Sequence, residues 1–157
     1  GVRVKTIVAG GTPSFPVHSK RGNVDVSPGT SLLWDYRYGE LFPDMTFAHA
    51  AVLMTRVLSK PQEGFLCLDL GHKSVAPEMP LPRVKFLGNA DFEQTGQSEE
   101  HLVVKTAQWD NYKVGDVLYA IPYHICPTVA KYHEVIAIKN GQKESFLDVF
   151  KKKENKV

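Results

Sequence analysis

The sequence predicts a mainly β fold, an antiparallel barrel or sandwich, and two observations support this. Apolar and β-branched runs recur at short intervals, with glycine, proline, asparagine and aspartate between them. Stretches with the 3.6-residue period of an amphipathic helix are scarce, which disfavours an all-helical fold or a regular alternation of strands and helices. We expect strands in these runs: 2–9, 24–26, 51–58, 65–70, 84–87, 102–106, 117–121 and 135–138.

Helical periodicity is confined to a short turn near residues 46–50 and a weak pattern at 142–151. A shift in composition at Phe42-Pro43-Asp44 separates two glycine-rich loops from the longer β runs that follow them. We therefore expect a structural boundary there. The chain would divide into residues 1–42, residues 43–150 and a polar tail over 151–157.

Composition excludes several classes of protein. With 157 residues and 43% hydrophobic content, the chain can bury a proper core. Nineteen basic and 17 acidic residues give a net charge of +2, which creates no field for nucleic acid or an anionic membrane. Two cysteines make no disulfide framework, and no apolar run approaches the roughly 20 residues of a transmembrane helix. We expect a cytoplasmic protein without nucleic-acid or membrane partners. Because the chain starts at Gly1 inside a strand-like run, we also expect a fragment.

Two glycine loops follow apolar strands and could bind an anion. The first, "AGGTPSFP", contains Gly11 and Thr12, and the second, "SPGTSLLWD", contains Gly29 and Thr30. Glycine lets backbone N–H groups turn toward a phosphate without a Cβ in the way, and the threonine hydroxyls add donors. The alternative for each loop is a tight turn without a ligand. If the loops converge as loops do at one end of a barrel, they would share a single phosphate.

The stretch "PYHICP" places His124 two residues before Cys126. In an extended segment both side chains would point to the same face. Imidazole nitrogen and thiolate suit a divalent ion such as zinc, and two protein ligands leave coordination positions open for Lewis-acid chemistry. The alternative is a buried free cysteine beside a histidine with ordinary hydrogen bonds. The other cysteine, Cys67, lies in an apolar run and is interpreted as a core thiol.

Two further clusters carry titratable groups. Ser98, Glu99, Glu100 and His101 precede a strand, where acid–base chemistry is possible but an exposed or interface position is favoured. Lys73 follows a glycine turn, and a Schiff-base role there is disfavoured because turn lysines are usually exposed.

Taken in order, "VAGGTPSFP", "VSPGTSLLWDYRY", "CLDLGHKSV", "SEEHLVV" and "PYHICPTV" resemble the C-terminal part of the D-threonine aldolase and D-serine dehydratase family, pyridoxal-phosphate enzymes of the alanine-racemase fold type. The resemblance covers about residues 3–138. It implies that residues 1–42 are the last strands and phosphate loops of an α/β (TIM-like) barrel and that 43–150 form a β domain with a metal site. Its matching residues are Gly11, Thr12, Gly29 and Thr30 for the phosphate, and His124 and Cys126 for zinc or manganese.

The resemblance also implies a reaction. In the family, pyridoxal phosphate stabilises a carbanion at Cα of a D-β-hydroxy amino acid while the metal binds the β-hydroxyl group. The outcome is aldol cleavage, as of D-threonine, or dehydration, as of D-serine. The H-x-C pair resembles the dehydratase ligands more than the aldolase pair, which has aspartate in place of cysteine, yet the "HICPTV" context also occurs in aldolase-like members, so both reactions stay open.

The family's Schiff-base lysine has no counterpart in this chain, so we expect it upstream and expect no catalytic residue here. Family dimers make a homodimer the default. The competing hypothesis is a non-catalytic β domain or binding module without turnover.

Overall fold

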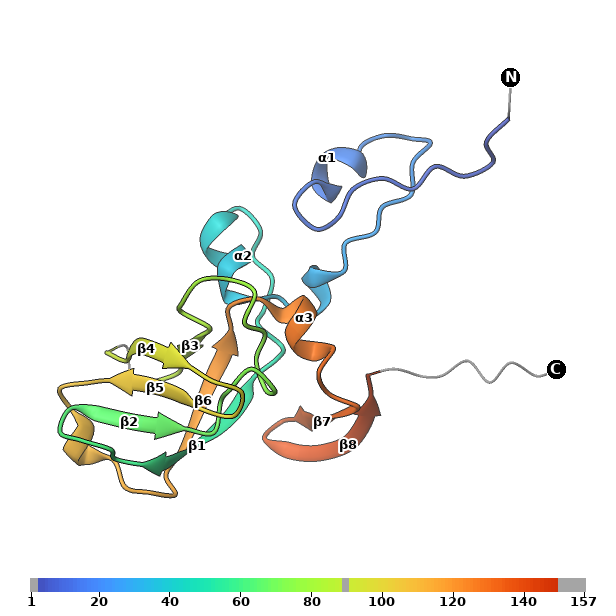
Figure 1. Ribbon diagram of the computed structural model, residues 1–157. Coiled ribbons are helices and arrows are strands. Elements are labelled where there is room, and N and C mark those ends of the chain that lie inside the picture. Colours follow the sequence, from blue (N-terminus) through green and yellow to red (C-terminus); the bar gives the residue numbers. More distant parts are fainter. Residues whose placement is uncertain (1–2, 89–90, 150–157) are drawn as a thin grey trace.

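The structure, a computed structural model, describes residues 3–88 and 91–149 and confirms a mainly β fold. The described residues form a six-stranded sheet and a two-stranded hairpin. The two lie apart from each other in Figure 1. The order of the larger sheet is β3-β6-β1-β2-β5-β4, and every neighbouring pair in it is antiparallel. Its strands are β1 (Leu53–Ser59), β2 (Phe65–Leu68), β3 (Val84–Phe86), β4 (Glu93–Gln97), β5 (Leu102–Lys105) and β6 (Val117–Pro122).

The core lies on one face of this sheet because apolar residues alternate along its strands. Leu66 and Leu68 of β2 and Leu102 and Val104 of β5 are fully buried, as expected for period-two side chains on one face. The paired strands therefore contribute the same face to a common cluster. The buried members of the cluster are Val57, Leu66, Leu68, Leu70, Val75, Val84, Phe86, Leu102, Val104, Tyr112 and Ala120.

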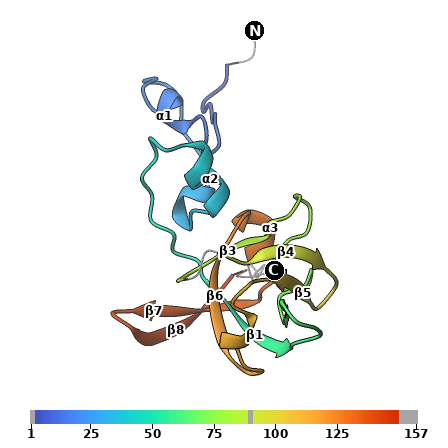
Figure 2. The same ribbon diagram turned by 90° about the vertical axis from the view of Figure 1, so that its left-hand side faces the viewer.

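The sheet curls until its two edge strands, β3 and β4, face each other (Figure 2). Among the described residues no backbone ladder joins these edges, but the side-chain amide of Gln94 in β4 bonds to both backbone groups that such a ladder would use. Its nitrogen donates to the Val84 carbonyl at 2.6 Å, and its oxygen accepts from the Arg83 N–H at 2.7 Å. The rings of Phe86 and Phe92 meet edge to face beside it, with centroids 4.9 Å apart. The sheet is therefore a curled half-barrel whose two edge strands are joined by side-chain contacts.

The hairpin consists of β7 (Glu134–Lys139) and β8 (Gln142–Asp148), paired antiparallel. The helical expectation for 142–151 is therefore wrong over its described residues, and residues 150–151 lie outside them. Asn140 and Gly141 connect the strands, with φ of 52° and 74°. Positive φ at both central residues is typical of a two-residue hairpin turn, and it reverses the chain where a helix would have continued. The expectation of a helical turn at 46–50 is also wrong, and those residues form no regular element.

The N-terminal part contains short helical elements: α1 (Phe15–His18), a 3₁₀ turn over Thr30–Leu32 and α2 (Tyr36–Leu41). Between residues 3 and 42 the only β pairing is one parallel bridge that joins Val8 to Asp25. Strands of a TIM-like barrel are therefore not shown here. That barrel, and the division of the chain at residues 42 and 43, stay predictions, while the tail at 151–157 lies outside the described residues.

Two further helical elements are a 3₁₀ turn over Trp109–Asn111 and α3 (Ile125–Val129), which follows β6. Across the described ranges, no helix combines the length and apolar character that crossing a membrane requires.

Candidate functional site

The candidate metal ligands lie at the junction of β6 and α3. His124 has extended backbone and is the N-cap of α3, whereas Cys126 lies inside the first turn of that helix. The premise of an extended segment is therefore wrong beyond His124. Helix formation is compatible with Pro127 because a proline in the first turn has no intrahelical N–H bond to lose. The two donors sit on one helical turn rather than on one face of a strand.

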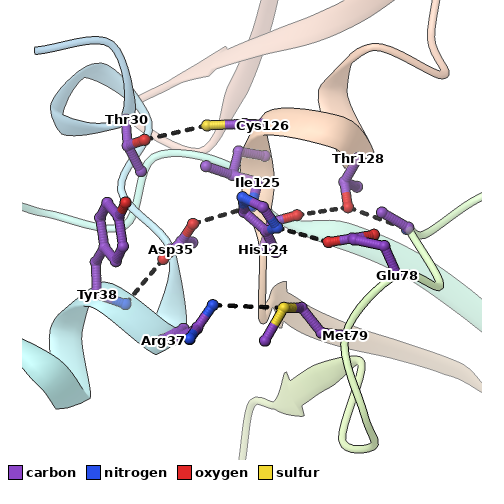
Figure 3. A network of polar contacts seen from close by, with 11 residues as sticks. Thr30, Asp35, Arg37, Tyr38, Glu78, Met79, His124, Ile125, Cys126 and Thr128 are labelled. Carbon is purple, nitrogen blue, oxygen red and sulfur yellow. Dashed lines mark hydrogen bonds and ion pairs between the residues drawn. The ribbon is translucent and has the colours of Figure 1, made fainter. Parts of the chain in front are cut away.

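Asp35 fixes this junction to the N-terminal part of the chain. Its carboxylate is buried, with 1% of the residue exposed, and it accepts two backbone N–H bonds. One comes from Tyr38 at the start of α2 (2.9 Å) and the other from Ile125 at the start of α3 (3.0 Å), as Figure 3 shows. A single carboxylate thus caps two helices that are far apart in sequence. The N–H of Arg37 adds a bond to the Tyr123 carbonyl at 3.3 Å.

The imidazole of His124 contacts the carboxylate of Glu78, which lies in the loop between β2 and β3. The distance between Nδ1 and Oε1 is 2.5 Å. Because an ionised carboxylate only accepts hydrogen bonds, Nδ1 carries the proton in this contact. When the ring binds a metal in its neutral form, its lone pair is therefore on Nε2, the atom that remains for a ligand. Both side chains are partly exposed, 32% for His124 and 41% for Glu78, so a ligand can reach the ring.

Cys126 contacts the second glycine loop. Its sulfur lies 3.0 Å from the hydroxyl oxygen of Thr30, and these two groups share a hydrogen bond (Figure 3). The N–H of Thr30 in turn donates to the hydroxyl of Thr12 at 3.0 Å. The expected proximity of the two glycine loops is therefore confirmed. Their binding of phosphate stays a prediction.

The polar groups of the loops divide into two sets. Thr12 and Thr30 are buried and hydrogen-bond to each other, so they hold the loops together. The exposed Gly11 and Gly29 have N–H groups that donate to no acceptor within the described residues. A Cβ built on Gly29 would meet nothing within 4 Å. Free N–H groups beside open space fit the phosphate of a cofactor, so Gly11 and Gly29 are candidates to bind it.

His124 and Cys126 also fit a divalent metal by their chemistry. A neutral imidazole with a free Nε2 and a thiolate sulfur are both ligands that zinc prefers. A carboxylate on the other ring nitrogen is the usual partner of a metal-binding histidine. Within residues 3–88 and 91–149 no cluster of three or more histidine, cysteine, aspartate or glutamate side chains is arranged for a metal. The pair alone would leave coordination positions open.

The other predicted groups lie elsewhere. Lys73 pairs with Glu100 at 2.8 Å and with Glu99 at 3.5 Å, and all three are exposed, so the solvated interpretation of both motifs is confirmed. These contacts, mainly the hydrogen bond and charge of Glu100, raise the pKa of Lys73. Cys67 is a free, partly buried thiol in β2.

Sequence reasoning missed Asp35, Glu78 and Thr128. The position of Asp35 before the helical stretch of α2 was an available N-cap signal. Glu78 had none, because it reaches His124 across 46 residues of sequence. Thr128 links α3 to the loop between β2 and β3. Its hydroxyl donates to the His124 carbonyl at 2.7 Å and accepts from the Ala76 N–H at 3.2 Å.

Comparison with known proteins places these residues in context. Residues 50–138 match the family model described as "Putative serine dehydratase domain". The chain is 27% identical over 155 residues to a D-threonine aldolase of Arthrobacter sp., a match that covers 95% of this chain and 40% of that protein.

Three solved structures show the same fold. The D-threonine aldolase of Filomicrobium marinum superposes with a TM-score of 0.82 at 22% identity, covering 94% of this chain and 42% of that one. A variant of D-threo-3-hydroxyaspartate dehydratase with one histidine replaced by alanine superposes with a TM-score of 0.75 at 16% identity, covering 95% and 44%. A second variant, with alanine for a cysteine numbered two positions later, is described as metal-free; it has a TM-score of 0.70 at 17% identity and covers 90% and 43%. The chain thus spans less than half the length of each of these proteins.

Proposed function

The chain belongs to the putative serine dehydratase domain family, as the C-terminal domain of a protein like D-threonine aldolase and D-serine dehydratase, and from this premise we propose its role. It supplies the metal-binding part of a pyridoxal-phosphate lyase that acts on small D-β-hydroxy amino acids. The observation that carries the proposal is the junction of β6 and α3, where His124 and Cys126 each have a partner that orients the donor atom.

Dehydration is the reaction we favour. This chain has a histidine and a cysteine two positions apart, the same spacing as the two residues replaced in the variants of D-threo-3-hydroxyaspartate dehydratase. The cysteine variant is described in its metal-free form, which distinguishes it from a form with metal. Aldol cleavage is the second candidate, because an aldolase is the 27%-identical relative and another aldolase superposes with a TM-score of 0.82.

The described residues would divide the work between two cofactors. Pyridoxal phosphate, when bound, supplies an electron sink for charge at Cα, and zinc or manganese supplies a Lewis acid for the β-hydroxyl group. The N–H groups of Gly11 and Gly29 would hold the phosphate, while the buried pair of Thr12 and Thr30 keeps the two loops at a fixed separation.

At the metal, His124 would bind through Nε2 and Cys126 through its sulfur. The hydroxyl of Thr30 donates to the sulfur once this is a thiolate, which lowers the electron density on the ligand and limits its rotation. The Schiff-base lysine is expected in the barrel of the complete protein. We further propose a cytoplasmic homodimer, without nucleic-acid or membrane partners.

The test uses the complete protein with pyridoxal phosphate and zinc or manganese. D-Serine, D-threonine and D-threo-3-hydroxyaspartate are supplied separately, with their L-isomers as controls. Ammonia with a keto acid supports dehydration, and glycine with an aldehyde selects aldol cleavage. Absence of turnover of any D-β-hydroxy amino acid would reject both reactions.

Metal analysis gives an independent test of the site. The complete protein is expected to bind one divalent ion at this junction, and Cys126→Ala is expected to lose most of that affinity. Because the thiolate and the neutral imidazole are the binding forms, affinity should also fall on acidification. Equal stoichiometric zinc in the wild type and in Cys126→Ala would contradict the assignment of this cysteine.

A further inference from the structure

We propose that Glu78 is a positioning residue for the metal site: its carboxylate fixes the tautomer and the orientation of the His124 ring, so that Nε2 faces the metal. The proposal rests on the proposed function, because it requires His124 to be a ligand. It adds a residue from a different segment of the chain, the loop between β2 and β3.

The first step of the argument is the contact itself. Nδ1 of His124 and Oε1 of Glu78 are 2.5 Å apart, which is hydrogen-bonding contact with a carboxylate acceptor, and such bonds are shorter and stronger than those between two neutral groups. A free imidazole can rotate about two bonds and exchange its proton between the ring nitrogens. A carboxylate on Nδ1 removes both freedoms, because it accepts only from a protonated nitrogen at one ring orientation.

The second step is that both ends of this contact are held by backbone bonds. On the histidine side, the Tyr123 N–H donates to the Arg83 carbonyl at 2.8 Å, and the Ile125 N–H donates to Asp35 at 3.0 Å. The residues directly before and after His124 are therefore anchored. The ring starts from a fixed backbone.

On the glutamate side, the buried hydroxyl of Thr128 connects the two segments. It donates to the His124 carbonyl and accepts from the N–H of Ala76, which lies two residues before Glu78. Figure 3 shows the resulting path from α3 through Thr128 to the loop that carries Glu78. A surface ion pair between two mobile side chains contributes little, but here the loop that presents the carboxylate is bound to the helix that presents the ring.

The test measures metal affinity in the complete protein by competition with a chelator, using Zn²⁺ and Co²⁺. Glu78→Ala is expected to weaken affinity at least tenfold, the usual range for loss of such an outer partner, and the isosteric Glu78→Gln several-fold. The matched control is Glu99→Gln, which removes a carboxylate from an exposed pair with Lys73 and should leave affinity unchanged. If Glu78→Ala does not fold, the comparison of Glu78→Gln with Glu99→Gln still decides the proposal.

The absorption spectrum of the Co²⁺ protein separates positioning from structural damage. The sulfur of Cys126 should still give its thiolate-to-cobalt band in the Glu78 variants once Co²⁺ is saturating, although more Co²⁺ is needed. Loss of that band at saturation would mean that the junction has collapsed and would overturn the positioning role. Affinity within twofold of the wild type in both Glu78 variants would also overturn it.

A double variant tests whether Glu78 affects metal affinity only through the His124 ring. If Glu78 acts only through the ring, His124→Ala and His124→Ala with Glu78→Ala should have the same residual affinity. A further loss in the double variant would show that Glu78 reaches the metal by another route, against the proposal. A different result would reject the proposed function: metal affinity equal to the wild type in both His124→Ala and Cys126→Ala. That result does not depend on the Glu78 variants.

Discussion

The curled sheet and the N-terminal segment before it differ in how they are held. All buried members of the core cluster lie between Val57 and Ala120, in the sheet and its loops. In the N-terminal segment, residues 3–42, by contrast, Trp34 is the single buried apolar side chain, the other buried residues are Thr12, Thr30 and Asp35, and Val4, Val8 and Val17 are exposed. The sheet is stabilised by an extended apolar core, whereas the N-terminal segment has a few ring contacts around Trp34 and hydrogen bonds to the sheet domain.

This difference shows which contacts hold the residues of the candidate site in place. The contacts that orient it join the two regions: Asp35 to Ile125, and Thr30 to Cys126. The candidate metal ligands follow β6 of the sheet, and the candidate phosphate loops belong to the N-terminal segment. The site should therefore depend on the stability of the sheet and, separately, on the bonds that fasten the N-terminal segment to it.

The strongest test of the comparison is a matched pair of leucine truncations. Leu66 is fully buried in β2, and Leu32 of the N-terminal segment is 80% exposed. Leu66→Ala should lower the free energy of unfolding by about 2–5 kcal/mol, because it leaves a cavity in the core. Leu32→Ala should change it by less than about 0.5 kcal/mol. Urea unfolding of both variants gives the two values, and similar losses would refute the contrast.

A matched pair of glycines gives the next largest effect. A Cβ on Gly71 would lie 2.3 Å from the backbone of Glu99 and Glu100, whereas one on Gly22 would meet nothing within 4 Å. Gly71→Ala should destabilise by about 1–3 kcal/mol, because backbone cannot move aside as a side-chain tip can. Gly22→Ala should be neutral or slightly stabilising. Thermal unfolding checks both, and an unchanged melting temperature in Gly71→Ala would contradict this packing.

Asp35→Asn sharpens the comparison at the join between the regions. The amide keeps one acceptor oxygen, so either Tyr38 or Ile125 loses the partner of its buried N–H. We expect a loss of about 1–3 kcal/mol in the free energy of unfolding and weaker metal binding, since the two candidate ligands are the N-cap and a first-turn residue of α3. Asp25→Asn, at an exposed residue of the N-terminal segment, is the control. Unchanged stability and metal affinity in Asp35→Asn would show that this join does not order the site.

The smallest effect concerns pH. Burial alone would raise the pKa of Asp69, but hydrogen bonds from the Arg56 N–H, from Thr55 and from the Arg56 side chain outweigh it, so the pKa is lowered. A lowered pKa in the folded state contributes stability above the unfolded value near 3.9, and this contribution is lost as the pH falls through the folded value. Asp69→Asn should therefore flatten the loss of stability between about pH 5 and pH 2.

Denaturant titrations at several pH values measure that slope. Asp44→Asn is the control, because Asp44 is an exposed residue outside the sheet. Equal slopes in the wild type and in Asp69→Asn would remove Asp69 from the acid sensitivity of the sheet.

Much of the sheet could be predicted from the sequence because its strands carry apolar residues with period two. Strand β4 could not, since its sequence EQTGQ has no apolar residue. It pairs with β5, and its glutamine side chains bond to Arg83 and Val84, contacts that depend on the tertiary fold. Strand β8 was mistaken for a helix, although Asn140-Gly141 before it is a strong hairpin signal.

The candidate site could be predicted only in its local parts. The pair of His124 and Cys126 and the convergence of the two glycine loops follow from motifs within a few residues of sequence. The conformation of the pair could not be predicted from such motifs. It depends on the hydrogen bond from the Ile125 N–H to Asp35, which lies 90 positions away in the sequence. For the same reason, no local pattern pointed to Glu78.

The side-chain closure between β3 and β4 has a consequence for association between molecules. An edge strand presents free N–H and C=O groups on which another chain can add a strand, which is a common start of aggregation. At the start of β3, the amide of Gln94 already bonds to the Val84 carbonyl and to the N–H of Arg83 directly before the strand, as the backbone of a neighbouring strand would. One glutamine thereby withholds this edge from intermolecular strand addition.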